Sequence, residues 1–353
     1  MRNVVVARDP AAARAAQTVI EDGANAVDMA VAGMLAGAVR SSSSSILGGC
    51  GMLVVGTGVG RHWIDGRPRA PGLGERRKKT PELPPAHWGA AVPGFFQGVF
   101  AAHARFGTLT LTQLARAAVS AVREEGGGRL LKPRLELMEA AARQGLPGLE
   151  RAGFVRSALA AVGPAADGLF TEDDLKLTPA PVRELVPCTQ AGFEVFSFPR
   201  GVPRWSNTPP DPLPALTTDA VVACDKLGVF CVGAWLVAPE GVALEGMPGI
   251  TLPDLIPLPR KGITRWRPGG PLPLPFAMAA FAQESNAFGA FALTGRGALV
   301  ERGDALLNAR LEATGSEIRL GDGADAPVWD AKALWVQREL VGDRVQGDLL
   351  AVE

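Results

Sequence analysis

The stretch LPALTTDAVVACDKLGVFCVGAW runs from Leu213 to Trp235 and sets two threonines, Thr217 and Thr218, at the head of an apolar run. The segment directly before them, residues 199–216, carries six prolines. Proline fixes φ and removes backbone donors, so this segment predicts an extended linker. DAVVACD and VFCVGAWLVAP, which follow, predict paired strands. The threonine pair is therefore either an ordinary strand edge, or Thr217 is a nucleophile that is freed when the bond before it is cut.

The composition is that of a globular chain without an excess of charge. Of its 353 residues 47% are hydrophobic, which is ample for a core, and Lys+Arg and Asp+Glu both number 36. A net charge of zero offers no electrostatic reason to bind nucleic acid or an anionic membrane. With four cysteines, no CxxC motif and three histidines, the chain does not predict a metal site.

The sequence shows neither a membrane span nor an export signal. The apolar run in MRNVVVARDP is too short for a signal peptide, and no segment approaches the roughly 20 apolar residues of a membrane span. We therefore expect a soluble, cytoplasmic protein.

The linker separates a helix-rich part, residues 1–198, from a strand-rich part, residues 217–353. In the first part, Asp9 and Pro10 predict the start of a helix that Gly23 ends. NAVDMAVAGMLAGAVR is apolar nearly all round and predicts a buried helix. This order of elements indicates layered α+β packing, with both parts in one domain.

Two shorter segments of the helix-rich part give local predictions. TEDDL, residues 171–175, begins with a threonine and carries acids in its first turn, which predicts the start of another helix. Residues 68–87 are rich in Pro, Arg and Lys and predict an exposed loop.

Six fragments resemble, in the same order, the gamma-glutamyltranspeptidase family. EDGANAVDMAVAGMLAG resembles its first helical signature, and SSSSILGGCGMLVV its Ser-Gly loop with the strand that follows. WIDGRPRAP lies where the family carries an arginine-containing segment, and AAVPGFFQGVFAAHARFGTLTLTQLARAAV resembles its Val-Pro-Gly helix and Gly-Thr-Leu turn. DGLFTEDDLKLTPAPVREL, with GFEVFSFP, resembles the end of the family's N-terminal part, and TTDAVVACD the start of its small subunit. The matches span residues 5–200 well and 213–297 more weakly, and their shared order makes the resemblance specific.

The resemblance implies a four-layer αββα, N-terminal-nucleophile hydrolase fold and an enzyme that cuts its own chain before a threonine. Thr217 matches that threonine. Its freed α-amine, with an ordinary pKa near 8, would accept the proton of its own hydroxyl, which then attacks a γ-glutamyl amide. We therefore expect an amide hydrolase or acyl transferase, as in glutathione metabolism. Its partner would be a small γ-glutamyl compound or analogue, and no metal or organic cofactor is implied.

The resemblance also assigns the other residues of the site. Arg67 matches the arginine that holds the substrate carboxylate, and a guanidinium fork suits that group. Thr218 is expected to contact the substrate, and LTGRGAL places Gly295 and Gly297 where the family has oxyanion-binding glycines. Alternatives stay open at this point. Arg67 is a further loop arginine or the structural partner of a buried acid, Arg69 takes its role in a shifted register, or the glycines only form a turn.

Three departures from the family count against this assignment. The chain is short between FSFPRG and Thr217, and Asp219 stands where a histidine is usual. Neither GAWLVAPEG nor Pro273 and Leu274 supplies the hydroxyl and amide groups that belong there, and each missing bond to a charged group costs roughly 1.5–3 kcal/mol. The alternative is an uncleaved, catalytically inactive relative that acts as a binding or assembly protein. The oligomeric state is open, with a homodimer as one alternative.

Overall fold

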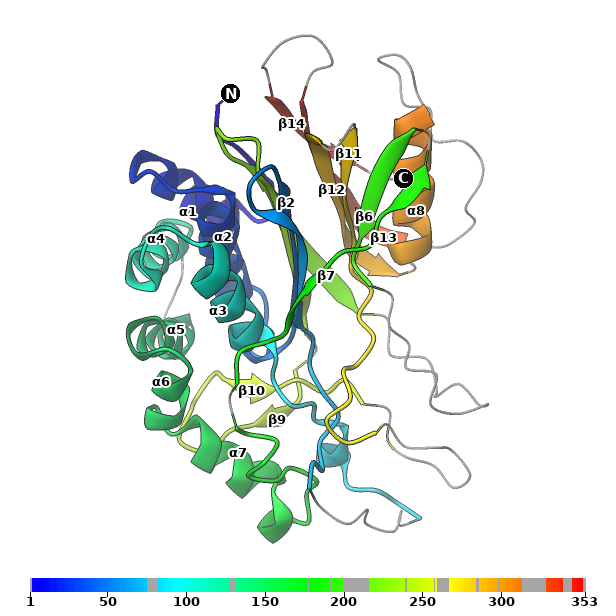
Figure 1. Cartoon of the computed structure of the whole chain (residues 1–353). Coiled ribbons are helices and arrows are strands. Elements are labelled where there is room, and N and C mark those ends of the chain that lie inside the picture. Colours follow the sequence, from blue (N-terminus) through cyan, green and yellow to red (C-terminus); the bar gives the residue numbers. More distant parts are fainter. Residues whose placement is uncertain are drawn as a thin grey trace.

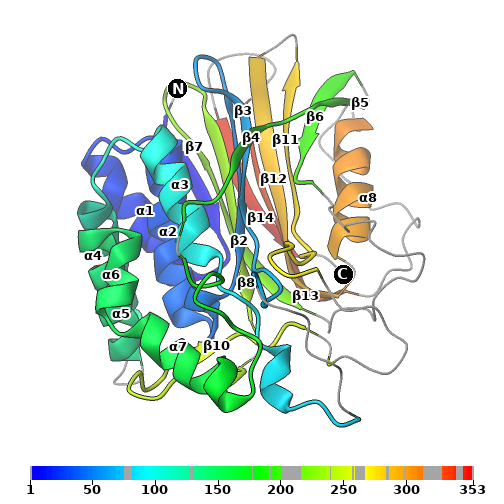
Figure 2. The same cartoon turned by 60° about the horizontal axis from the view of Figure 1, so that its bottom comes forward.

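The structure is a computed structural model in which strands form two sheets packed face to face, with helices outside each sheet (Figure 1). The first sheet is covered by helices from the first half of the chain and the second by α8 (Leu299–Glu312), and Figure 2 shows α8 on the side opposite the other helices. The structure describes residues 2–351 except 75–81, 127–130, 177, 191, 200–215, 239, 257, 259–266, 284–285, 298, 313–327 and 339–344. The predicted linker therefore lies outside the described residues, apart from its end residues Pro199 and Leu216.

The helical layer begins with two well-capped helices, α1 (Pro10–Glu21) and α2 (Ala26–Arg40). The side chain of Asp9 accepts a hydrogen bond from the Ala12 N–H at 2.9 Å, which satisfies a free donor of the first turn of α1. Buried along nearly its whole length, α2 lies directly on the first sheet, where a Cβ at Gly37 would collide with Trp235. The layer continues with α3 (Phe95–Phe106), α4 (Leu111–Glu124), α5 (Lys132–Gln144), α6 (Leu146–Arg151), α7 (Phe154–Val162) and the short 3-10 turns η1 (Ser45–Leu47), η2 (Ala86–Gly89) and η4 (Pro164–Ala166).

All pairs of neighbouring strands described are antiparallel. The first sheet has the spatial order β4 (Val182–Glu184), β3 (Gly60–Gly66), β2 (Cys50–Gly56), β8 (Phe230–Val237), β7 (Thr217–Cys224) and β1 (Val4–Ala7). The second has the order β5 (Cys188–Gln190), β6 (Phe193–Ser197), β11 (Ala277–Gln283), β12 (Asn286–Gly297), β13 (Val328–Arg338) and β14 (Val345–Ala351). A separate ribbon is formed by β9 (Val242–Ala243) and β10 (Thr251–Leu252).

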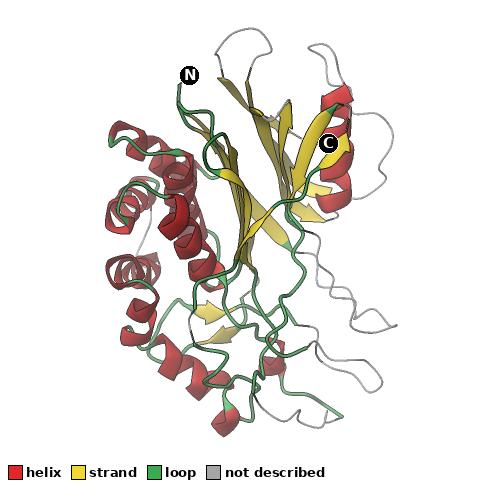
Figure 3. Ribbon diagram, in the orientation of Figure 1, coloured by secondary structure: helices red, strands yellow, loops and turns green. Residues whose placement is uncertain are grey.

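The two sheets join along one strand, β7. Its last four residues pair with β1, whereas its first two, Thr217 and Thr218, pair with the end of β12. The sheets diverge away from this junction, as the yellow strands of Figure 3 show. Apolar side chains fill three spaces: between the helical layer and the first sheet, between the two sheets, and between the second sheet and α8. The predicted α+β, four-layer αββα architecture is confirmed.

One predicted helix is wrong, and its N-terminal signal has another use. Residues 171–175 form a turn, although the Thr171 N–H donates to Asp174 and the Asp174 N–H donates to Thr171, as at the start of a helix. The Asp174 carboxylate also accepts the backbone N–H groups of Gly72 and Leu73. The turn therefore anchors a neighbouring loop, and the nearby prolines of TPAP prevent a helix from continuing.

The loop predicted over residues 68–87 is exposed only in part. Its first residues, Pro68, Ala70 and Pro71, are buried, and Leu83 is exposed. The Ala70 N–H donates to the carbonyl of Gly270, so the loop is held against a distant segment of the chain. The prediction treated Pro and Arg as surface residues and could not include this long-range contact.

Candidate functional site

Thr217 and Thr218 lie where the two sheets join. Thr217 stands opposite Val237 of β8 on one side and Arg296 of β12 on the other. Thr218 stands opposite Gly295 in the same way. The strand that carries both threonines is thus the one through which the sheets are connected, and it begins directly after the proline-rich segment.

The side chains of the two threonines lie on opposite faces of the first sheet. Side chains alternate along a strand, and from Ala220 to Cys224 they alternate between the core between the sheets and the core under the helices. This alternation puts Thr218 between the sheets and Thr217 on the helical side. Thr218 is 1% exposed, and its hydroxyl has no hydrogen-bond partner among the described residues. Thr217 is half-buried.

The glycines predicted to bind an oxyanion lie beside the threonines. Gly295 has a φ of 127°, in the region that favours glycine, and the register of β12 against β13 shifts between Thr294 and Arg296. This bulge turns the backbone of β12 just opposite Thr218. Gly297 is the last residue of the strand and pairs with Val328. The oxyanion role itself stays a prediction.

Arg67 lies at the same end of the strands of the first sheet as the threonines, and its side chain faces the space between the sheets. Its Nε and Nη2 donate to the two carboxylate oxygens of Asp65 at 2.7 and 2.9 Å. The guanidinium also lies 5.8 Å from the ring of Trp63 and 5.9 Å from that of Phe198. At 6% exposed, Arg67 is therefore part of a buried ion pair, which is the structural alternative left open by the sequence. Arg69 is held by its backbone, paired with Val92.

Arg67 lies at the same level of the first sheet as the threonine pair, three strands away. Gly66, Cys50, Trp235 and Asp219 form one row across β3, β2, β8 and β7. Arg67 follows that row directly, so three strand spacings, about 14 Å, separate its backbone from that of β7.

Asp219 is a buried carboxyl group on the same face as Thr217. Its side chain accepts one hydrogen bond, from the Ala220 N–H at 2.8 Å, and forms no ion pair with any described residue. Burial raises the pKa of Asp219 to about 7, against the opposing effects of the Ala220 hydrogen bond and of Arg8. The sequence identified Asp219 only as a departure from the family.

The serine loop fixes the end of β8 beside Thr217. The hydroxyls of Ser42 and Ser44 donate to the carbonyl of Ala238, and the Ala238 N–H donates to Oγ of Ser45. Ala238 directly follows Val237, the partner of Thr217. The serine loop of the resemblance therefore has a structural role here, because its hydrogen bonds hold the end of β8 next to the site.

Sequence reasoning missed Arg296, which stands directly opposite Thr217. Residues that oppose each other on antiparallel strands place their side chains on the same face, with Cβ atoms about 5 Å apart. Arg296 is exposed, and no described residue pairs with its guanidinium. Only the pairing of β7 with β12 reveals this position, although Arg296 lies between the two glycines that the sequence singled out.

A match to a known family bears on these assignments. Residues 12–143 match the sequence model of the gamma-glutamyltranspeptidases. The resemblance to this family is thereby confirmed. The match covers α1 to α5 and supports a gamma-glutamyltransferase-like acyltransferase or amidase. It ends well before Thr217, so it does not test the nucleophile.

Solved structures extend the likeness over the whole chain. The cephalosporin acylase from Bacillus halodurans is similar with a TM-score of 0.57 and 14% identity, covering 100% of this chain and 96% of that one. The structure of LmbA2991HD is similar with a TM-score of 0.60 and 15% identity, covering 99% and 98%. At these identities the likeness establishes the fold. No curated protein matches the sequence.

The described residues were also compared with the requirements of a metal site and of a membrane span. They contain no group of three or more His, Cys, Asp or Glu side chains arranged to hold a metal ion. None of the helices among them combines the length and the apolar character needed to cross a membrane.

Proposed function

We propose that the protein is an amide hydrolase or acyl transferase that uses Thr217 as an N-terminal nucleophile after cutting its own chain. The position of Thr217 carries this proposal. It is the first residue of the strand that joins the two sheets, it lies next to Thr218, which stands opposite the bulged Gly295 at φ 127°, and it directly follows the proline-rich segment. The gamma-glutamyltranspeptidase match over residues 12–143 supports the reaction class.

The chemistry needs few groups beyond Thr217 itself. After cleavage, its α-amine takes the proton of its hydroxyl, and the hydroxyl oxygen attacks the carbonyl carbon of an amide. Backbone N–H groups at Gly295 and Gly297 stabilise the oxyanion, and the proton returns to the departing amine. The acyl ester on Thr217 is then transferred to water or to a second amine.

The proposed substrate is a small amide with a carboxylate, such as a γ-glutamyl compound. Arg67 is the anchor expected from the sequence, and its guanidinium forms an ion pair with Asp65. Arg296 is the second candidate, because it lies on the same face as Thr217. Replacement by lysine keeps the charge and removes the fork, so the true anchor should lose part of its affinity for carboxylates.

Two matched variants decide between the two arginines. Arg67→Lys and Arg296→Lys are compared with the wild type on amides that bear a carboxylate and on their carboxamide analogues. The KM for the carboxylates should rise about tenfold or more in the variant that lost the anchor, with the carboxamides unaffected. If neither variant changes this ratio, neither arginine anchors a carboxylate.

Turnover tests the proposal as a whole. We expect slow release of aniline from a γ-glutamyl anilide, because the hydroxyl and amide groups expected near Pro273 and Leu274 and in GAWLVAPEG are missing. Thr217→Ala should abolish turnover, and Thr217→Ser should retain part of it. A panel of small amides on which wild type and Thr217→Ala behave alike would contradict the proposal.

One observation favours the second candidate, an uncleaved binding or assembly protein. Leu216 is 4% exposed and packs in an apolar cluster with Leu236, Ala238 and Leu272, so the residue before the bond is well accommodated in the intact chain. Cleavage would leave a new carboxylate there. An intact chain that binds small amides without turning them over would support this alternative. A cytoplasmic location and a homodimer stay predictions in either case.

A further inference from the structure

The buried carboxyl group of Asp219 lies close to the bond that the proposed function requires to be cut. Two residues along a strand span about 7 Å, so Thr217 and Asp219 are neighbours on the same face of β7. From that distance their side chains can be bridged by one water molecule. Asp219 is 9% exposed, and its only described hydrogen bond comes from its neighbour Ala220.

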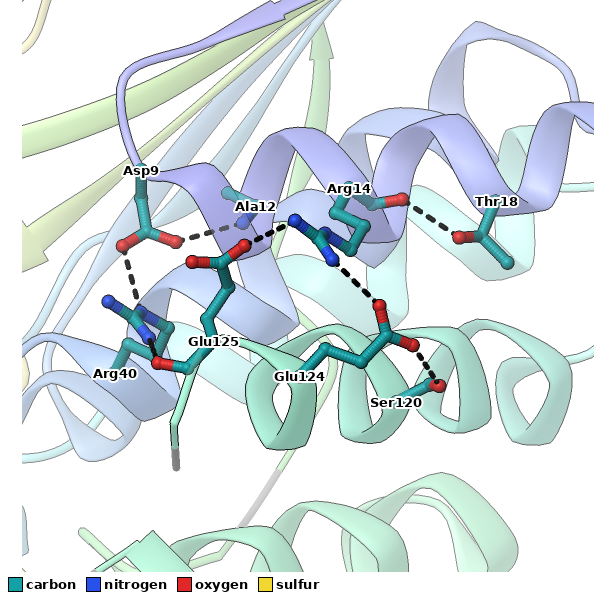
Figure 4. Close-up of polar contacts among 8 residues, drawn as sticks. All are labelled: Asp9, Ala12, Arg14, Thr18, Arg40, Ser120, Glu124 and Glu125. Atoms are coloured by element: carbon teal, nitrogen blue, oxygen red, sulfur yellow. Dashed lines mark hydrogen bonds and ion pairs between the residues drawn. The ribbon is translucent and has the colours of Figure 1, made fainter. Parts of the chain in front are cut away.

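The charges around Asp219 leave it without a direct partner. Arg8 and Asp9, in the turn between β1 and α1, act on it from a distance. Asp9 is engaged elsewhere, since it caps α1 through the Ala12 N–H and accepts from Nε of Arg40 at 3.1 Å (Figure 4). Arg40, the last residue of α2, also donates to the carbonyl of Glu125 and so links the end of α2 to the end of α4.

Two further described residues lie on neighbouring strands. Arg296 on β12 opposes Thr217, and Trp235 on β8, which opposes Asp219, is uncharged. A carboxyl group that is buried without a cation is costly, so its place two residues after a candidate nucleophile calls for a role.

We propose that the Asp219 carboxylate is the general base of self-cleavage, taking the proton of the Thr217 hydroxyl through one bridging water. This inference rests on the proposed function and assigns the step before it. In the intact chain the nitrogen of Thr217 is an amide and cannot accept a proton, so the amine that serves later turnovers does not yet exist. Another base is required, and among the described residues Asp219 is the carboxyl group nearest to Thr217 along its face of the strand.

The step balances without any reactant except water. Oγ1 of Thr217 attacks the carbonyl carbon of Leu216 while its proton passes to Asp219. The bond from that carbon to the Thr217 nitrogen breaks, and Asp219 returns the proton to the nitrogen. Leu216 is now held as an ester on Thr217. One water molecule hydrolyses the ester to a Leu216 carboxyl group and a free Thr217.

The reaction should depend on pH in a defined direction. The base must be ionised, and burial raises the pKa of Asp219 to about 7. Below that value the rate of cleavage should fall tenfold for each pH unit, and above it the rate should be constant.

The experiment follows cleavage of newly synthesised, labelled full-length chain between pH 5.5 and 8.5. Asp219→Asn keeps the shape of the side chain and removes the base, so cleavage should slow by 10²-fold or more and lose its pH dependence. Asp254→Asn is the matched control. Burial also raises the pKa of Asp254, which bridges Ala90 and does not belong to the strand that carries Thr217, so this variant should cleave like the wild type.

The outcomes distinguish a failure of Asp219 as the base from a failure of the proposed function. If the wild type cleaves and Asp219→Asn cleaves equally fast, Asp219 is not the base and the proposed function stands. If the wild type stays intact at every pH, the proposed function and this inference both fail. If Asp219→Asn does not fold, as judged by a thermal melt, the wild-type profile decides, and a rate that is constant from pH 5.5 to 8.5 overturns the proposal.

Discussion

Arg67 and Thr217 lie at the same end of the strands of the first sheet, but their side chains make very different contacts. Arg67 is 6% exposed and makes a two-pronged ion pair with Asp65 between two aromatic rings. Thr217 is half-buried, and neither its hydroxyl nor the guanidinium of Arg296 opposite has a described partner. The guanidinium of Arg67 is engaged in contacts within the fold, whereas the Thr217 hydroxyl and the Arg296 guanidinium remain available for chemistry. The predictions below test this contrast through stability.

The largest effect is expected at Arg67. Arg67→Ala should lower the free energy of unfolding by about 3–5 kcal/mol, because it leaves the Asp65 carboxylate buried without its cation. Chemical denaturation measures this loss. Arg143→Ala is the matched control, since Arg143 is exposed and lies 4.0 Å from Glu139, and its effect should stay within about 0.5 kcal/mol.

A stable Arg67→Ala variant would contradict the structural half of the comparison. It would mean that the arginine can be spared by the fold and is free to serve a substrate. A destabilised variant whose stability is regained in the double variant Arg67→Met with Asp65→Leu would sharpen the comparison, because buried pairs can often be replaced by apolar groups of similar volume.

The next effect is expected at Asp219. Its pKa is raised to about 7 in the folded chain against about 4 in the unfolded chain, so the folded state holds more protons between these values. The free energy of unfolding of the wild type should therefore fall as pH rises from 4 to 7. Asp219→Asn lacks this loss and should gain stability relative to the wild type, by up to about 4 kcal/mol at pH 8.

Denaturation of both proteins at several pH values measures the difference. The two curves should run apart between pH 4 and 7 and stay parallel above pH 8. Curves that stay parallel throughout would show that Asp219 is ionised normally, and its burial would then have no chemical consequence.

The smallest effect is expected at Thr218. Its hydroxyl is buried without a described partner, and valine has nearly the same shape. Thr218→Val should therefore raise the free energy of unfolding by about 1–2 kcal/mol. The predicted contact with substrate adds a second readout, because KM should rise in the same variant. A loss of stability would mean that the hydroxyl is satisfied in solution.

The sequence predicted what depends on neighbouring residues. Asp9 and Pro10 locate the start of α1, and the apolar character of α2 predicts its burial, because both signals are local. The helix predicted at TEDDL was wrong because the Asp174 carboxylate binds the backbone of Gly72 and Leu73, a contact that no local pattern contains. The four layers followed from a resemblance, since the division of strands between two sheets is set by distant pairing.

The site was predictable in part for the same reason. Thr217 lies on β7, beside the end of β12 that carries Gly295 and Gly297, and their roles stay predictions. The pairing of Arg67 with Asp65 could not be distinguished from substrate binding by sequence, since both uses place a guanidinium beside a carboxylate. Arg296 and the shared face of Thr217 and Asp219 depend on register, and register is a property of the folded sheet.

The most direct test of the central claim is the mass of the purified chain under denaturing conditions. Two pieces are expected, one ending at Leu216 and one beginning at Thr217 with a free amine that N-terminal labelling detects. Thr217→Ala should remain a single chain, which controls for cleavage by other proteases. A wild-type chain that keeps its full mass after long incubation, or a cut at any bond other than that between Leu216 and Thr217, would contradict self-cleavage before Thr217.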